Sequence, residues 1–519
     1  MNFFLVSSKE LIKSLLNLSD AIKRLYPSII IFNDITKGLY PLNFIISNVY
    51  NDKVLKIFPD IHQFYNLKEN NVFIPIFTTL PLSSETPIDL FERLFKGNPF
   101  AFLLNSGNIS PNSCYSFLGA FHKPFIKGNH DVNPLLQLQS LLDSCKSNGI
   151  DYLPHFWGGA VGYFGYDIVR LFEKIPKIAL DDIHIPEIYI GFTDEVIVFD
   201  HLEKAIKVIV CLKRGEEYEY GAERLNRIVS KITSHQSPVT SHQFKAKNLK
   251  SNMTKPQFIN MVKKAKGYIK EGDIFQANLS QRFEAEFEGD PWEFYKRLNY
   301  INPSPFGGYI DFGNMQIVSA SPERLIKVNG RHIETRPIAG TRPRGKDSTE
   351  DKSLSAELLL NEKERAEHIM LVDLERNDLG RVCKYGSVRV EELMTLESYS
   401  HVWHIVSKVA GELREDIRFI DMLRACFPGG TITGCPKVRC MEIIDELEPV
   451  RRGIYTGSMG YIGYSGMIDL NIMIRSALVK GDKIYFHAGA GIVADSEPER
   501  EYEETLFKAR AIMEALKNG

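Results

Sequence analysis

The sequence predicts a mixed α/β fold of the α+β type, built on large antiparallel β-sheets. Strand-like and helix-like runs are interspersed along the 519 residues, without the strict alternation of a doubly wound parallel sheet. A second indication is the dipeptide Asn329-Gly330, which is typical of tight antiparallel hairpins and directly follows a strand-like run. Both observations favour antiparallel pairing between neighbouring strands.

Short apolar runs predict strands in the first half of the chain, at residues 28–32, 101–104 and 195–199. The following segment, residues 232–252, is polar and rich in Ser, Thr, Gln and Lys, which is typical of a linker or surface excursion. We therefore divide the chain into an N-terminal region at 1–232, a polar linker or excursion at 233–252 and a C-terminal region at 253–519.

The C-terminal region begins with a predicted amphipathic helix. Its apolar residues fall at helical spacing, and Gly272 is well placed to end it. These apolar residues are Phe258, Met261, Val262, Ala265 and Ile269. Strands are then expected at residues 306–312, 315–319 and 325–328.

Composition excludes several classes of protein. The formal charge of −2 gives no electrostatic reason to expect binding to nucleic acid or to a membrane surface. No apolar run approaches the roughly 18 residues of a membrane helix, and the first residues do not resemble a signal peptide. Seven cysteines, an odd number in so long a chain, indicate reduced thiols. We therefore expect a cytoplasmic protein.

Two acidic segments carry the clearest chemical signal. Residues 361–378 read NEKERAEHIMLVDLERND and residues 496–505 read SEPEREYEET. Glu364 and Glu367 are three residues apart, as are Glu501 and Glu504, so each pair shares one face of a helix. Facing carboxylates repel unless a cation lies between them, and an oxygen-only donor set suits Mg²⁺. The alternative is that both are ordinary solvated helix faces.

The start of the second acidic helix is predicted from its own residues. Ser496 can cap the helix, and Glu499 lies three positions later, which is the spacing of a capping box. Such a cap would fix the first turns, which carry Glu501 and Glu504.

Several long motifs occur in one order around these segments. They read ETRPIAGTRPRG at 334–345, FPGGTITGCPKVR at 427–439 and HAGAGIVADS at 487–496, with a looser match, GGAVGYFGYD, at 158–167. Together they resemble the chorismate-utilising enzymes, which include component I of anthranilate synthase and of aminodeoxychorismate synthase. The resemblance covers about residues 250–515. It implies two large packed β-sheets with helices outside, a chorismate-binding catalytic region after residue 252 and a regulatory-like region before it.

The resemblance also implies roles for individual residues. Glu367 and Glu504 are the expected Mg²⁺ ligands, with Glu501 and the catalytic Glu364 close by. The expected substrate-binding residues are Gly340, Thr341, Tyr455, Arg475, Gly489, Ala490 and Gly491. Arg475 would bind a carboxylate at the end of a strand-like run, and the glycines would present N–H groups to an anion. Taken alone, Gly489 and Gly491 could equally mark a bulge or tight turn.

His404, Thr431 and Gln276 complete the expected catalytic residues. A protonated imidazole could assist departure of the ring hydroxyl of chorismate. The alternative for His404 is a buried core histidine, since apolar residues flank it, and His401 is a competing candidate three residues earlier.

The expected reaction depends on two residues. Relatives that add water carry Lys where this chain has Gln276, and glutamine is a poor general base. Aminodeoxychorismate synthases typically carry a nucleophilic Lys where this chain has Ala339. Direct attack by ammonia, followed by loss of pyruvate to give anthranilate, is therefore the leading interpretation. The motifs PGGTITG at 428–434 and NLSQRF at 278–283 resemble the aminodeoxychorismate branch, which stays the alternative.

An effector site for tryptophan is expected to be weakened. Ser106 matches the family, but Asn105 stands where anthranilate synthases usually have Glu. In the segment containing Pro305 and Phe306, Gly307 replaces a bulky residue.

The chain has no room for a glutaminase domain of the Cys-His-Glu type. The resemblance therefore implies a separate glutamine amidotransferase subunit that supplies ammonia. A non-enzymatic binding or regulatory protein on the same fold would require losses among the acidic pairs, His404 or Arg475, and none is lost.

Overall fold

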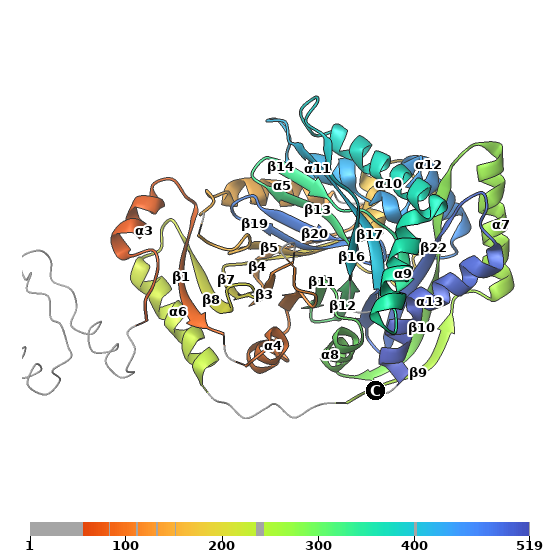
Figure 1. The fold of residues 1–519 in the computed structure, drawn as a ribbon. Helices are drawn as coiled ribbons and strands as arrows, with labels where there is room; N and C mark the ends of the chain where they lie inside the picture. The colour runs from red at the N-terminus through yellow and green to blue at the C-terminus, as the bar shows by residue number, and fades with distance from the viewer. Residues whose placement is uncertain are drawn as a thin grey trace, which may run out of the picture. The chain divides into compact units, whose positions relative to one another are not determined.

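The structure is a computed structural model that describes residues 55–82, 84–110, 113–130, 133–150, 152–234, 243–398 and 402–517. Within Lys56–Gly519, which form one compact unit, two large β-sheets organise the fold (Figure 1). Every pairing between neighbouring strands in either sheet is antiparallel. This confirms the predicted fold class.

The larger sheet has 12 strands. Its order is β1 (Phe73–Pro81), β8 (Ala205–Lys213), β7 (Glu195–Asp200), β3 (Tyr115–Ala120), β2 (Ala101–Asn105), β11 (Phe306–Asp311), β12 (Met315–Ser321), β21 (Ser476–Lys480), β22 (Lys483–Ile492), β10 (Gln276–Gly289) and β18 (Gly434–Cys435), with β9 (Phe244–Ser251) also paired to β10.

The smaller sheet has 10 strands. Its order is β15 (Ile338–Pro343), β17 (Val402–Glu412), β14 (His332–Thr335), β13 (Arg324–Asn329), β20 (Ile468–Asn471), β19 (Ser458–Gly463), β5 (Gly159–Phe164), β6 (Ile188–Thr193) and β4 (His122–Gly128), with β16 (Arg389–Ser398) also paired to β17.

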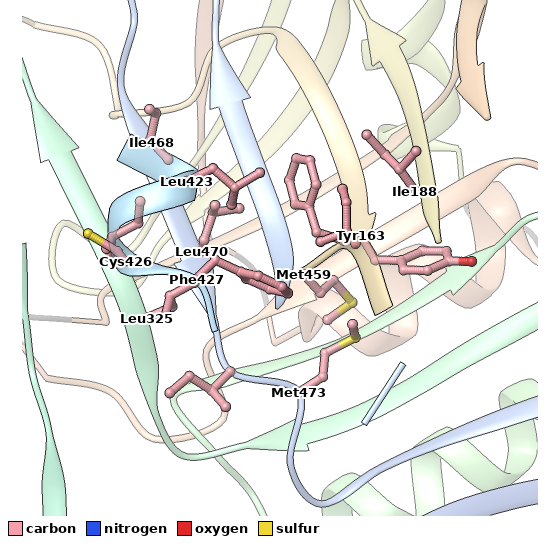
Figure 2. Packing of buried hydrophobic residues seen from close by; sticks show 14 of the residues in the cluster. Tyr163, Ile188, Leu325, Leu423, Cys426, Phe427, Met459, Ile468, Leu470 and Met473 are labelled. Atoms are coloured by element: carbon pink, nitrogen blue, oxygen red, sulfur yellow. The ribbon is translucent and has the colours of Figure 1, made fainter. Parts of the chain in front are cut away.

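Side-chain alternation along the larger sheet gives it two apolar faces. On β2, Phe102 joins a buried cluster that contains residues of both sheets, whereas Leu103 joins a second cluster with the helices. Figure 2 shows part of the first cluster, where Tyr163 and Met459 lie near Phe427. The main core therefore lies between the sheets.

The helices pack against the two sheets. They are α3 (Ile61–Lys68), α4 (Pro87–Phe95), α5 (Pro134–Cys145), α6 (Tyr218–Thr233), α7 (Lys255–Glu271), α8 (Pro291–Ile301), α9 (Ser348–Leu360), α10 (Glu362–Gly380), α11 (Phe419–Cys426), α12 (Lys437–Leu447) and α13 (Pro498–Lys517). Helix α10 packs on β15 and β17, while α13 packs on β22. The two acidic segments are thus attached to different sheets. None of the described helices is long and apolar enough to cross a membrane.

Most of the predicted elements are present. Helix α7 buries the expected apolar face and ends at Gly272, whose φ of 84° suits glycine. The strands expected near 101, 195, 306, 315 and 325 are β2, β7, β11, β12 and β13. The strand expected at 28–32 lies outside the described residues.

The polar segment at 233–252 is only partly a connection. Its residues 244–251 form β9, an edge strand whose side chains are mostly exposed. Strands from both sides of this segment also share both sheets, because β2 pairs with β11 and β5 pairs with β19. The regions before and after the segment therefore build one body.

Candidate active site

Helices α10 and α13 bring the four predicted glutamates together. Burial raises the pKa of Glu367, Lys363 opposes that shift, and the charges of Glu364, Glu501 and Glu504 raise the pKa further. Burial likewise raises the pKa of Glu501. Carboxylates separated by about 135 residues in sequence thus lie within electrostatic reach of one another.

In the structure, cationic side chains form ion pairs with three of these carboxylates. Arg342 Nη1 lies 3.2 Å from Glu364 Oε1, Lys363 Nζ lies 3.8 Å from Glu367 Oε1, and Lys508 Nζ lies 2.7 Å from Glu504 Oε1. Among the described residues, no three His, Cys, Asp or Glu side chains already converge as a metal site. The donor chemistry nevertheless fits Mg²⁺, because a divalent cation could replace these partners beside an oxygen-only set of ligands.

The predicted capping box at Ser496 and Glu499 is wrong by one residue. Helix α13 begins at Pro498, and its first helical hydrogen bond runs from Glu501 N to Glu497 O at 3.0 Å, so Glu497 occupies the cap position. Proline has no backbone N–H and is therefore well suited to the first helical position. The helix accordingly begins at Pro498, one residue later than predicted. Ser496 Oγ instead accepts a bond from Val493 N at 3.1 Å.

Strands β15 and β17 place Gly340, Thr341 and His404 together. His404 Nδ1 lies 3.0 Å from Thr341 Oγ1 and 3.1 Å from the carbonyl oxygen of Gly340. Gly340 has a φ of 63°, and a Cβ there would lie 3.0 Å from Glu364 Oε2. A glycine is therefore required where the strand passes between His404 and the acidic helix.

The protonation state of His404 differs from the expectation. Burial lowers its pKa to about 4, and Arg475 adds to this shift, so the ring is neutral at pH 7. Because the Gly340 carbonyl can only accept a bond, the ring proton resides on Nδ1. His404 could act as an acid only after a nearby negative charge raised its pKa. The competing His401 lies outside the described residues.

The sequence suggested that Arg475 ends a strand, but the structure places it elsewhere. Strand β20 ends at Asn471 and β21 begins at Ser476, so Arg475 lies in the connection between them, with a φ of 51°. Its effect on His404 places the guanidinium near the imidazole. The anticipated cation therefore belongs to this site, although a turn positions it.

Strand β22 forms another wall of the site. The side chain of Ala490 joins the core, so Gly489 and Gly491 face the opposite side of the strand. A Cβ on Gly489 would lie 2.7 Å from Tyr455 Oη, and one on Gly491 would lie 2.6 Å from Gln276 Nε2. These glycines allow the side chains of Tyr455 and Gln276 to pack closely against the strand backbone.

Two residues of this site were missed from the sequence. Burial raises the pKa of Glu323 to about 8, opposed by the Thr431 hydroxyl and by the N–H of Ile338. Glu323 therefore holds a proton at neutral pH, beside the predicted Thr431. The other missed residue is Lys508, whose Nζ donates to Gly489 O at 3.2 Å. Its position four residues after Glu504 was an available signal.

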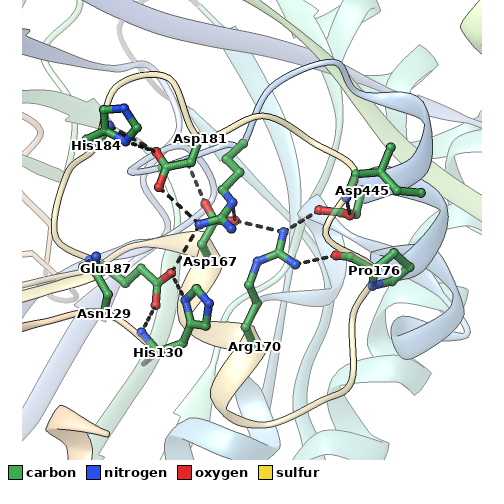
Figure 3. Close-up of polar contacts among 12 residues, drawn as sticks. Asn129, His130, Asp167, Arg170, Pro176, Asp181, His184, Glu187 and Asp445 are labelled. Carbon is green, nitrogen blue, oxygen red and sulfur yellow. Dashed lines mark hydrogen bonds and ion pairs between the residues drawn. The ribbon is translucent and has the colours of Figure 1, made fainter. Parts of the chain in front are cut away.

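The loop that carries Tyr455 is held by buried ion pairs. Arg452 is 2 % exposed; it bonds Glu448 Oε1 at 2.7 Å and the backbone oxygen of Asn278 at 2.6 Å. Behind it, Asp167 accepts a bond from Gly453 N at 3.1 Å. Figure 3 shows the polar contacts around Asp167, where Arg170 joins Asp167 to Asp445. The loop is thereby fixed from both sides.

Three of the predicted effector residues line a separate cavity of about 80 Å³. Pro305, Phe306 and Gly307 contribute to its wall, together with Asn105. Ser106 does not, since its hydroxyl donates to Ser113 O at 2.5 Å. Sequence reasoning also missed several polar lining residues. They include Cys114, His155, Lys327 and Asp469.

Comparisons with known proteins agree with this geometry. The family model of the chorismate binding enzymes matches residues 120–514. Anthranilate synthase component 1 of Aquifex aeolicus is 44% identical over 473 residues, which is 87% of this chain and 96% of the relative. Aminodeoxychorismate synthase component 1 of Bacillus subtilis is 41% identical over 454 residues, covering 84% and 96%. The crystal structure of anthranilate synthase component I from Streptococcus pneumoniae superposes with a TM-score of 0.70 at 35% identity, covering 83% of this chain and 98% of that one. The chain is therefore a member of the chorismate binding enzyme family.

Proposed function

We propose that this chain aminates chorismate with ammonia and eliminates pyruvate to give anthranilate. The observation that carries the proposal is Ala339. It lies on β15 beside Gly340, opposite Ile405, at a half-buried position. A methyl group there can neither attack the ring nor accept a proton, so the nitrogen nucleophile is free ammonia.

The reaction needs a carbon–nitrogen bond at ring carbon 2 and loss of the hydroxyl from carbon 4, followed by elimination of pyruvate. Glu323, which burial keeps protonated at neutral pH, would supply the proton for a leaving group. Arg475 would bind a substrate carboxylate. Glu367 and Glu504, with Glu364 and Glu501, would hold Mg²⁺, which offsets charge on the ring carboxylate. Ammonia would come from a separate glutamine amidotransferase subunit.

Aminodeoxychorismate formation is the second candidate. It is favoured by Asn278 in the NLSQRF motif and by the 41% identity to the Bacillus subtilis aminodeoxychorismate synthase component. This product would keep its enolpyruvyl group until a separate lyase removed it.

Mass spectrometry of the product tests both candidates. The purified chain is incubated with chorismate, Mg²⁺ and an ammonium salt, with an ammonium-free reaction as control. Anthranilate and pyruvate released together support the first proposal, and an amino product that retains the enolpyruvyl carbons supports the second. An Ala339→Lys variant should divert or block the first reaction, because its amine would compete with ammonia for the ring.

A further inference from the structure

In the first half of helix α10, which the structure describes completely, only one side chain is buried. The buried residues of this helix begin at His368, and the next is Leu371. Within the fully described segment 362–370, which carries Glu364 and Glu367, no apolar side chain is buried. Burial of apolar side chains, the usual anchor of a helix face, therefore does not fix the position of these two carboxylates.

A hydrogen bond to strand β17 holds His368 instead. Its Nε2 lies 2.6 Å from Ser407 Oγ, and both residues are fully buried. Among the described residues, Nδ1 of the ring has no hydrogen-bond partner, so the contact with Ser407 is the polar anchor of this imidazole. Ser407 lies three residues after His404 on the same strand. The bond therefore joins the acidic helix to the strand that carries the candidate-site imidazole.

Ser407 also fixes a distorted segment of strand β16. Met394 N donates to Ser407 Oγ at 2.9 Å, in the stretch where the pairing of β16 with β17 changes register between Glu392 and Thr395. Met394 has a φ of 53°, which costs a residue other than glycine about 1–3 kcal/mol. Such distortions persist where the surrounding structure imposes them, and bulged strands are frequent beside active sites. The hydroxyl of Ser407 is thus the point at which α10, β16 and β17 meet.

We propose that His368 and Ser407 are positioning residues, whose bond holds α10 at the rotation about its axis that turns its two glutamates towards α13. His368 lies one residue after Glu367 and one helical turn after Glu364, so anchoring its side chain fixes the direction of both carboxylates. Loss of a residue that supports a metal ligand commonly weakens metal binding by about 10–100-fold. The inference rests on the proposed function, because it needs these carboxylates to hold Mg²⁺.

Isothermal titration calorimetry with Mg²⁺ provides the test, with chorismate present and ammonia absent so that no amination takes place. Ser407→Ala removes the oxygen that His368 contacts, so the Kd for Mg²⁺ should rise about tenfold. His368→Leu should have the same effect, whereas His368→Gln can place its amide nitrogen near the position of Nε2 and should stay close to wild type. The double variant of His368→Leu and Ser407→Ala should bind no more weakly than either single variant, because both changes break the same bond.

Ser147→Ala is the matched control. Ser147 is also buried, and its Oγ likewise accepts a bond from a backbone N–H, that of Phe73 on β1 at 2.8 Å. Its loss should lower the melting temperature and leave the Kd for Mg²⁺ unchanged. An unchanged Kd in both Ser407→Ala and His368→Leu overturns the inference, as does a double variant that binds far more weakly than both. If the wild-type chain binds no Mg²⁺, the proposed metal site itself fails and the inference fails with it.

Discussion

Burial acts in opposite directions on the pKa values of two groups in the candidate site, Glu323 and His404. It raises the pKa of Glu323 to about 8 and lowers that of His404 to about 4. At neutral pH the Glu323 carboxyl group is therefore protonated, whereas the His404 imidazole is neutral. In the free enzyme Glu323 is therefore a protonated carboxyl group, and His404 is a neutral neighbour of the Gly340 carbonyl.

The first prediction concerns pH. A carboxyl with a raised pKa is protonated below that value and ionised above it, so kcat should fall as pH rises through about 8. The rate must be measured at constant free ammonia, because the free base becomes more abundant over the same range. Glu323→Gln should lower kcat and remove its fall at high pH. If the variant kept the wild-type pH profile, another group would be responsible for that fall.

The second prediction concerns the acidic pairs. Glu367→Gln should reduce turnover by more than about 100-fold, because even residues behind a metal ligand affect activity by about 10–100-fold. Circular dichroism and melting temperature should stay close to wild type. Glu362→Gln, an exposed position on the same helix, is the control. Near-normal turnover of Glu367→Gln at saturating Mg²⁺ would remove Glu367 from the proposed ligands.

At the scale of elements, the loop between α12 and β19 both stabilises the fold and carries a residue of the candidate site. Arg452 binds Glu448 and also the backbone of Asn278 and Ile432, so it ties this loop to β10. Tyr455 lies three residues later and stacks on His487 at a centroid distance of 5.0 Å. Disturbing the ion pair should therefore affect both unfolding and substrate binding.

The third prediction follows from that ion pair. Arg452→Met should lower the free energy of unfolding by about 3–5 kcal/mol, because it leaves the buried Glu448 charge unpaired. Arg376→Met breaks an exposed ion pair with Asp373 and should change the free energy of unfolding by less than about 1 kcal/mol. Urea denaturation of the two variants gives the comparison. Equal, small effects would show that Glu448 is stabilised without Arg452.

Local sequence patterns predicted helices and strands better than they predicted the burial and pKa values of individual side chains. Helix α7 followed from apolar spacing and Gly272, and the strands β11 to β13 followed from short apolar runs. Strand β9 was missed because its exposed edge position requires few apolar residues, and its pairing with β10 is not a local property. The shifted pKa values of Glu323 and His404 were equally inaccessible, since residues distant in sequence produce the burial.

For the whole molecule, the fourth prediction concerns the cavity at Asn105. Tryptophan should bind weakly or not at all, because Asn105 is uncharged and Asp469 is already engaged by Arg324 at 2.8 Å. Isothermal titration calorimetry measures this directly. Asn105→Glu, which adds a carboxylate, should tighten binding. Tight, inhibitory binding by the wild-type chain would contradict the prediction.

The fifth prediction concerns the source of nitrogen. The purified chain should form product with ammonium salts, faster at higher free-ammonia concentrations, and should be inactive with glutamine alone. Product formation is followed by mass spectrometry with each nitrogen donor. Glutamine-dependent turnover by the pure chain would mean that no amidotransferase subunit is needed.

The interleaving of early and late strands has a consequence for synthesis on the ribosome. Strand β5 is made long before its partner β19, whose pairing begins with Phe164 opposite Ser458. At roughly 5–20 residues per second, the intervening segment of about 300 residues takes on the order of 15–60 s to translate. During that interval the nascent chain carries β5 without this neighbour, and β2 likewise waits for β11. Unpaired edges of this kind favour aggregation, so production of the native enzyme should depend on chaperones that shield the unfinished sheets.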